Sequence, residues 1–156
     1  YGTALDMDVI AWSENLTDEK AAAAGARRVT KQQLFELADV ISVHLVLSDR
    51  SRGIVGAQDL ARMKPGAVII NTSRGPLIDE SALLTALQAG KVAAGLDVYD
   101  REPLPADHPL RTLPNVVLTP HLGYVVRESM SAFYTQLVEN ALAFMDGKPI
   151  RLMSPS

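Results

Sequence analysis

Short apolar runs alternate with longer amphipathic segments along most of this 156-residue chain. Apolar runs bounded by turn residues indicate strands, and apolar positions repeated every three or four residues indicate helices. Several of the runs are nearly continuous in Val and Ile, as expected for parallel strands covered on both faces. We predict six strands, at Asp8–Trp12, Arg27–Val29, Val40–Leu45, Ala67–Asn71, Val92–Val98 and Val116–Thr119.

Amphipathic segments lie between these strands and after the last of them. The predicted helices are Asp18–Ala24, Lys31–Ala38, Ala57–Met63, Asp79–Ala89 and about Val126–Met145. Thr30 and Gln33 have the spacing of a capping box, and Gly25, Gly66 and Gly90 stand where helices should stop. Strands that alternate with helices in this way predict an α/β fold with a doubly wound, Rossmann-like parallel sheet.

The start of the chain lacks a part that such a domain normally has. The first βα unit usually carries a Gly-x-Gly-x-x-Gly turn for a pyrophosphate, and no such motif occurs here. We therefore expect a sheet without its first strand and glycine-rich loop, in a chain that begins in mid-protein. In the order 3-2-1-4-5-6 the first strand is central, so its loss should leave a gap. Residues 1–150 are predicted to form this partial dinucleotide-binding domain, and 151–156 a tail leading toward an absent substrate domain.

Composition narrows the classes of function. The formal charge is −3 without runs of like charge, which argues against partners such as nucleic acid or an anionic membrane surface. Cysteine is absent, which excludes disulfides and thiolate sites, and no His-Glu-x-x-His spacing indicates a metal. No apolar run approaches the roughly 20 residues of a membrane-spanning helix. We expect a cytoplasmic protein without a metal.

Three polar side chains follow successive predicted strands. Arg74 comes just after Asn71, Glu102 follows the Val92–Val98 run, and His121 follows Thr119. Because ligands bind at the carboxyl edge of a parallel sheet, we expect these three side chains to form one site. A histidine can exchange a proton near neutral pH, a carboxylate can orient it, and an arginine can clamp a substrate carboxylate.

This combination predicts chemistry on a small hydroxy or keto acid. Asp97 and Asp100 remain alternative partners for the histidine, because spacing alone does not exclude them. His44 can either approach a cofactor or face a loop, and His108 has the setting of a turn residue.

The segments Asn71–Gly75, Gly95–Pro103 and Thr119–Gly123, in this order, resemble the D-2-hydroxyacid dehydrogenase family. The resemblance implies that Arg74 binds the substrate's carboxylate and carbonyl oxygen, that His121 is the general acid–base, and that Glu102 is its partner. It also implies a set of positions along the cofactor: Ser13, Val43, Leu45, Thr72, Asp97 and Gly123.

The resemblance also implies partners and a cofactor. The expected substrate is a small 2-hydroxy or 2-keto acid, and the expected assembly is a homodimer formed through this domain. Ser13 stands where an acidic residue often binds the adenosine ribose of NAD, and Glu14 would repel the extra phosphate of NADP. No Arg or Lys is adjacent to Ser13 in sequence, so we expect NAD, with NADP not excluded. The alternative function is a non-catalytic NAD(H)-binding sensor or corepressor-like protein, which sustained NADH consumption would separate from an enzyme.

Overall fold

The computed structural model describes residues 1–153 and divides the chain into two compact units. One unit is Tyr1–His121, and the other begins at Leu122. Residues 154–156 of the predicted tail lie outside the described residues. The single domain predicted over 1–150 stays a prediction.

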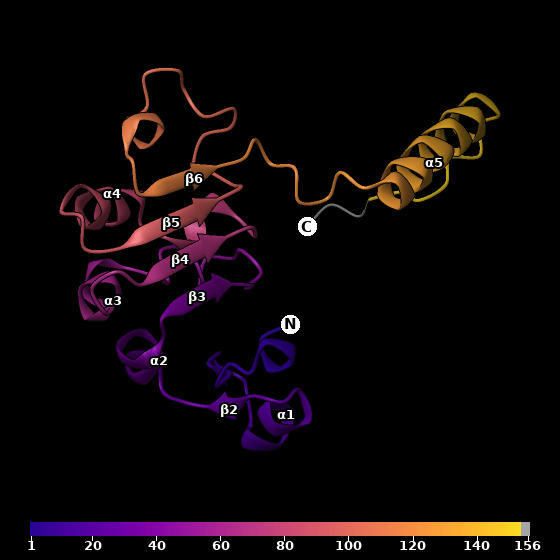
Figure 1. Cartoon of the computed structure of the whole chain (residues 1–156). Helices are drawn as coiled ribbons and strands as arrows, with labels where there is room; N and C mark the ends of the chain where they lie inside the picture. The colour runs from indigo at the N-terminus through magenta and orange to yellow at the C-terminus, as the bar shows by residue number, and fades with distance from the viewer. Residues whose placement is uncertain (154–156) are drawn as a thin grey trace. The chain divides into compact units, whose positions relative to one another are not determined.

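The first unit contains a four-stranded parallel sheet in the order β3 (Val40–Val43), β4 (Val68–Asn71), β5 (Ala93–Leu96) and β6 (Val116–Leu118). Figure 1 shows these strands side by side, each joined to the next by a crossover. A second, two-stranded parallel sheet consists of β1 (Ile10–Ala11) and β2 (Arg27–Arg28). All six predicted strands are present and shorter than predicted. The α/β, Rossmann-like fold is confirmed.

The helices also lie close to their predicted positions: α1 (Asp18–Ala23), α2 (Lys31–Leu37), α3 (Ala57–Arg62), α4 (Glu80–Gln88) and α5 (Arg127–Met145). The capping box of α2 is confirmed, because Thr30 Oγ1 accepts from Gln33 N at 3.1 Å and Gln33 Oε1 accepts from Thr30 N at 3.0 Å. Gly90 ends α4 with a φ of +66°, which a residue with a Cβ rarely adopts. Three short 3₁₀ helices were not predicted: η1 (Thr3–Leu5), η2 (Gly75–Leu77) and η3 (Pro109–Thr112).

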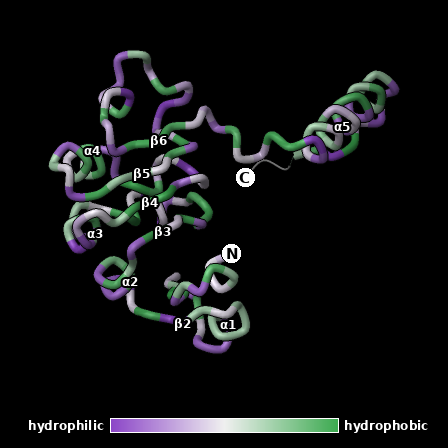
Figure 2. Tube along the Cα trace, viewed as in Figure 1, coloured by the Kyte–Doolittle hydropathy of each residue, from purple (hydrophilic) through white to green (hydrophobic). Residues whose placement is uncertain are grey.

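The hydrophobic core lies between one face of the four-stranded sheet and helices α2, α3 and α4. Figure 1 shows these helices on the same side of the sheet, and Figure 2 shows hydrophobic positions along its strands. Ile69 is fully buried, together with Leu60 of α3 and Leu87 of α4. On β3 and β6, however, Val40 is 50% exposed and Val117 is 70% exposed. The prediction of strands covered on both faces is therefore wrong for these outer strands, because successive side chains point to opposite faces and the core helices cover only one.

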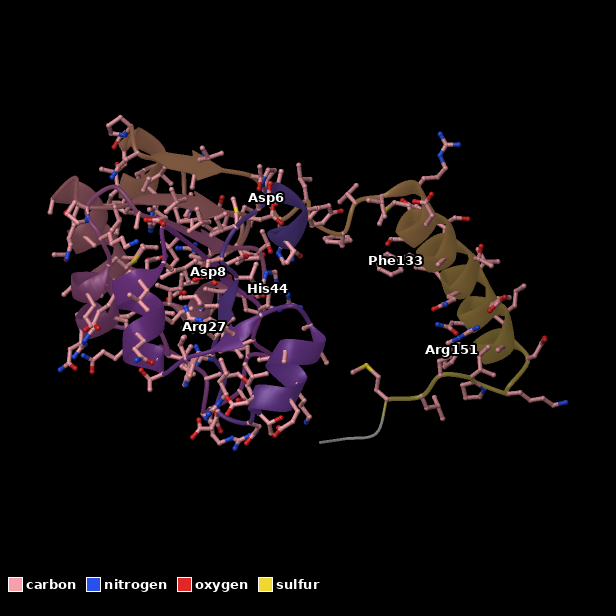
Figure 3. All side chains as sticks on the ribbon, turned by 60° about the horizontal axis from the view of Figure 1, so that its bottom comes forward. Asp6, Asp8, Arg27, His44, Phe133 and Arg151 are labelled. Carbon is pink, nitrogen blue, oxygen red and sulfur yellow. The ribbon has the colours of Figure 1, made fainter. Side chains whose placement is uncertain are left out.

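The two sheets separate at the position of the predicted gap. Among the described residues, β1 pairs only with β2, and β3 pairs only with β4. In the strand order 3-2-1-4-5-6, the first strand would lie between the elements seen here as β1 and β3. The segment before β1 is joined to β2 by an ion pair between Asp8 and Arg27, at 3.1 Å, both labelled in Figure 3.

The second unit consists of α5, the residues from Leu122 that precede it and the segment that follows it. The Arg151 guanidinium donates to Glu139 at 2.5 Å and to Asn140 at 2.8 Å, which joins this segment to the helix. No described residue of this unit is buried, and Phe133 of α5 (Figure 3) is 54% exposed. Within residues 1–153, no helix has both the length and the apolar character needed to cross a membrane.

Candidate active site

The carboxyl ends of the four strands are aligned by the register of the sheet. Val43 of β3 pairs with Asn71 of β4, Asn71 pairs with Leu96 of β5, and Leu96 pairs with Leu118 of β6. The segments that follow these four residues therefore leave the same edge of the sheet. This register explains why residues from three separate sequence motifs belong to one region.

The loop that presents Arg74 is held by two polar side chains. Asn71 is only 1% exposed; its Nδ2 donates to Arg74 O at 2.8 Å, and its Oδ1 accepts from Ser73 N at 3.1 Å. Ser73 Oγ donates to Val43 O at 2.8 Å, which ties the loop to the end of β3. The Arg74 side chain itself is exposed and donates to Ser73 O at 2.6 Å. We did not predict roles for Asn71 and Ser73. A polar amide directly after the apolar run Val68–Ile70 could have indicated that Asn71 holds the following loop.

Glu102 and His121 form a close pair. Glu102 Oε2 lies 2.6 Å from His121 Nδ1, and the two side chains are 35% and 34% exposed. The other carboxylate oxygen, Oε1, accepts from Tyr99 N at 3.0 Å. His121 has a φ of +57°, a left-handed conformation that is uncommon outside glycine and is found at functional sites in many proteins. The pair is thus exposed enough to meet a substrate and is fixed on its carboxylate side.

The two aspartates that were alternative partners occupy other places. Asp97 is 6% exposed, and its Oδ1 accepts from Thr119 Oγ1 at 2.5 Å. Asp100 is exposed, and the charges that act on it are those of Glu80, Arg52 and Asp79. At Nδ1 of His121 the structure therefore places Glu102 in preference to either aspartate.

The electrostatic environment favours an ionised Glu102. Burial alone would raise the pKa of this carboxyl, but the hydrogen bonds from His121 and from Tyr99 N outweigh it. The charges of His121 and Arg74 act in the same direction, so the pKa of Glu102 is lowered. An ionised carboxylate at Nδ1 accepts a hydrogen bond from the imidazole and orients the ring. The positive charge of Arg74 therefore acts on Glu102 as well.

The lowered pKa of Glu102 gives a prediction for stability. A carboxyl whose pKa is lower in the folded than in the unfolded state stabilises the fold when the pH is above its unfolded-state pKa, which is about 4.3 for Glu. This stabilisation is lost as the pH falls through the folded-state pKa. We expect Glu102→Gln to lower the urea midpoint at pH 7, with a difference from the unmodified protein that disappears in acid. The exposed Glu14, changed to Gln, is the control. If Glu102→Gln lowered the urea midpoint equally at all pH values, the lowered pKa of Glu102 would be contradicted.

Several positions expected to contact a cofactor lie along the same edge. Val43 ends β3, Leu45 follows it, Thr72 follows β4 and Asp97 follows β5. The buried carboxylate of Asp97 is an acceptor of the kind that a nicotinamide carboxamide requires, so the donor and acceptor set fits that end of a dinucleotide. Ser13 follows β1 in the smaller sheet. Gly123 belongs to the second unit.

The fit is less complete at the other parts of a dinucleotide. The chain has no Gly-x-Gly-x-x-Gly turn, so the pyrophosphate has no glycine loop here. Near the expected adenosine end, Lys31 Nζ lies 5.8 Å from the centre of the Trp12 ring. Because only residues adjacent to Ser13 in the chain were considered from the sequence, this lysine was not predicted. This ammonium is paired with Asp59 at 2.7 Å, so its charge is already compensated. The expectation of NAD is unchanged by this lysine.

The other histidine–glutamate pair of the chain has a different setting. His108 Nε2 lies 3.2 Å from Glu80 Oε1, and His108 Nδ1 accepts from Leu110 N at 3.3 Å. Both ring nitrogens are therefore occupied within the fold, where the histidine caps η3. By contrast, the Glu102–His121 pair borders a cavity of about 540 Å³ whose walls include Pro103, Leu104 and Leu118. No group of three or more potential metal-ligating His, Asp or Glu side chains occurs among residues 1–153.

Comparison with known proteins agrees with this architecture. The sequence profile of the family described as "D-isomer specific 2-hydroxyacid dehydrogenase, NAD binding domain" matches residues 1–123. The chain belongs to this family. Residues 1–123 therefore correspond to the NAD-binding domain of the D-isomer specific 2-hydroxyacid dehydrogenases, and their α/β fold is shared with a solved relative.

Individual relatives show how much of such a protein the chain represents. It is 38% identical to a glyoxylate reductase of Aeropyrum pernix over 94% of the chain and 44% of the relative. It matches the crystal structure of a phosphoglycerate oxidoreductase from Vibrio cholerae with a TM-score of 0.87 and 40% identity, over 94% of the chain and 47% of that structure. A D-lactate dehydrogenase with NAD⁺ from Lactobacillus jensenii matches with a TM-score of 0.78 and 27% identity, over 99% and 50%. The chain thus spans about half of these relatives or less.

Proposed function

We propose that this chain forms the cofactor-binding half of an NAD-dependent dehydrogenase that interconverts 2-keto acids and D-2-hydroxy acids. The observation that carries the proposal is the 2.6 Å contact between Glu102 Oε2 and His121 Nδ1 at the edge of the sheet that also bears Arg74. An acid–base pair beside a guanidinium suits a substrate that has both a carboxylate and a carbonyl. The family membership supports the same reaction class.

In the proposed reaction each of the three residues has a separate task. Arg74 holds the substrate carboxylate and the C2 oxygen through its guanidinium N–H groups. In the direction of reduction, His121 donates a proton to the C2 oxygen, and the ionised Glu102 stabilises the charged imidazole before that transfer. The nicotinamide, when bound, supplies or accepts the hydride at C2. In the direction of oxidation, His121 takes the proton back from the hydroxyl.

Substrate and assembly complete the proposal. A small 2-keto acid such as glyoxylate or hydroxypyruvate is the proposed substrate class, since curated relatives are named for these compounds. We propose Ser13, Val43, Leu45, Thr72, Asp97 and Gly123 as the contacts to NAD(H). A cytoplasmic homodimer, with residues 1–150 as the cofactor domain and the tail from 151 leading toward a substrate domain, is proposed on the family resemblance.

Cofactor binding by this chain is the first experiment. Trp12 is the only tryptophan and precedes Ser13, so energy transfer from it to bound NADH reports on the proposed site. We expect a saturable signal with NADH and weaker binding of NADPH. A folded sample without saturable NADH binding would contradict an autonomous cofactor site. Sustained NADH oxidation on addition of a 2-keto acid, measured in a two-domain protein carrying this chain, would then distinguish the dehydrogenase from a non-catalytic sensor.

A further inference from the structure

The side chain of Tyr99 connects the ends of two neighbouring strands. It is 7% exposed, and its hydroxyl lies 2.8 Å from Thr119 O and 3.1 Å from Leu96 O. Leu96 is the last residue of β5, and Thr119 follows β6, two residues before His121. The hydroxyl has one hydrogen, and the shorter distance favours donation to Thr119 O. The backbone segment that leads into His121 is thereby tied to β5.

The backbone of the same residue contacts the other two parts of the site. Tyr99 N donates to Glu102 Oε1 at 3.0 Å, which fixes the carboxylate that pairs with His121. A Cβ placed on Gly75 would lie 2.1 Å from the carbonyl carbon of Tyr99 and 2.3 Å from its oxygen. The loop that follows Arg74 is therefore packed directly against Tyr99, at a distance that only glycine permits. One residue thus touches all three segments that present the charged groups.

We propose that Tyr99 is a positioning residue that sets the geometry of the Glu102–His121 pair. Its backbone N–H fixes the carboxylate, and its hydroxyl fixes the strand end that carries the imidazole. The catalytic consequence of this role rests on the proposed function, whereas the geometric role does not. Tyr99 is not expected to touch the substrate or the cofactor.

The hydroxyl keeps its proton over the working pH range. Burial raises the pKa of Tyr99, and the nearby charge of Asp97 raises it further. A phenol with a raised pKa remains a hydrogen-bond donor at neutral pH, so its single hydrogen stays available to Thr119 O.

The substitution Tyr99→Phe tests this role because it removes the hydroxyl and leaves the ring and the backbone N–H in place. The readout is the NMR titration of the Glu102 side-chain carboxyl in the whole chain, with the signal assigned from Glu102→Gln. Because the hydrogen bond from His121 lowers the pKa of Glu102, we expect the Glu102 midpoint in Tyr99→Phe to rise from that of the unmodified chain toward that of His121→Ala. Tyr134→Phe, at a 70% exposed position of α5, is the matched control and should leave the midpoint unchanged.

Rescue and kinetics separate positioning from a general loss of stability. Para-aminophenylalanine at position 99 restores a donor at the ring's para position and should restore the midpoint, including in conditions where Tyr99→Phe folds poorly. In a two-domain protein carrying this chain, kcat should fall about tenfold while KM for NADH stays unchanged, since a small misplacement of a reacting group is costly.

A Glu102 midpoint in Tyr99→Phe equal to that of the unmodified chain would overturn the proposal, whatever happens to the melting temperature. If the unmodified two-domain protein reduces no 2-keto acid, the proposed function fails. The NMR comparison still decides the positioning role in that case.

Discussion

Replacing His121 by Asn should reduce the turnover of a 2-keto acid by about 100- to 10,000-fold, the range expected when a general acid–base is removed. Asparagine keeps a polar side chain of similar reach near Glu102 but cannot take up and release a proton near neutral pH. The 2.6 Å contact with Glu102 and the partial exposure of the imidazole place His121 where a substrate oxygen can meet it. NADH binding should be nearly unchanged, because the proton donor is not among the proposed cofactor contacts.

His108→Asn is the control for this prediction. His108 also contacts a glutamate, at 3.2 Å, but both of its ring nitrogens are occupied within the fold. We expect His108→Asn to lower stability, measured by urea unfolding, while the turnover of folded protein stays within a few-fold of normal. Both variants are assayed with NADH and hydroxypyruvate in a two-domain protein carrying this chain. Similar turnover for His121→Asn and the unmodified protein would refute the acid–base role.

Arg74→Lys should lower kcat/KM for the 2-keto acid by about 10- to 100-fold, since losing one of two parallel charge-assisted hydrogen bonds costs roughly 1.5–3 kcal/mol and a factor of ten corresponds to about 1.4 kcal/mol. Lysine keeps the positive charge but lacks the planar fork that holds a carboxylate with two parallel bonds. The loss should appear in KM for the acid as well as in kcat, because the same fork holds the substrate before and during the reaction.

The loop around Arg74 should keep its conformation in Arg74→Lys, so a kinetic change can be attributed to the side chain. Asn71 and Ser73 hold the loop through contacts to backbone atoms, and none of these contacts uses the Arg74 side chain. Arg74→Lys should therefore fold normally, as should the control Arg62→Lys at the end of α3. Arg62→Lys should not change kcat/KM. Unchanged kinetics for Arg74→Lys would remove Arg74 from the substrate site.

Much of the arrangement follows from local patterns in the sequence. Apolar runs located the strands, and the order of the βαβ units predicted that the segments after Ala67–Asn71, Val92–Val98 and Val116–Thr119 would meet at one edge. The register of β4, β5 and β6 agrees with this prediction. The absence of a glycine loop predicted a gap in the sheet, and the two sheets separate at that point. These features depend on periodicity and on the connection rules of parallel sheets, so sequence is enough to predict them.

Other features depend on contacts between distant segments. The sequence favoured Glu102 as the partner of His121, but spacing did not exclude Asp97 or Asp100; the contact with Glu102 is set by the path of the loop after β5. Tyr99 lies in that loop: its backbone N–H donates to Glu102, and its hydroxyl contacts Leu96 at the end of β5 and Thr119 just after β6. The exposed face of Val40 and Val117 was also unpredictable, because an apolar run does not show which faces the helices cover.

The most direct test of the account is the product formed from hydroxypyruvate and NADH by a two-domain protein that carries this chain. We predict sustained oxidation of NADH with D-glycerate as the product, and loss of this activity in His121→Asn. L-glycerate as the product, or turnover that survives both His121→Asn and Arg74→Lys, would contradict the assignment of this chain to a D-specific dehydrogenase acting through these residues.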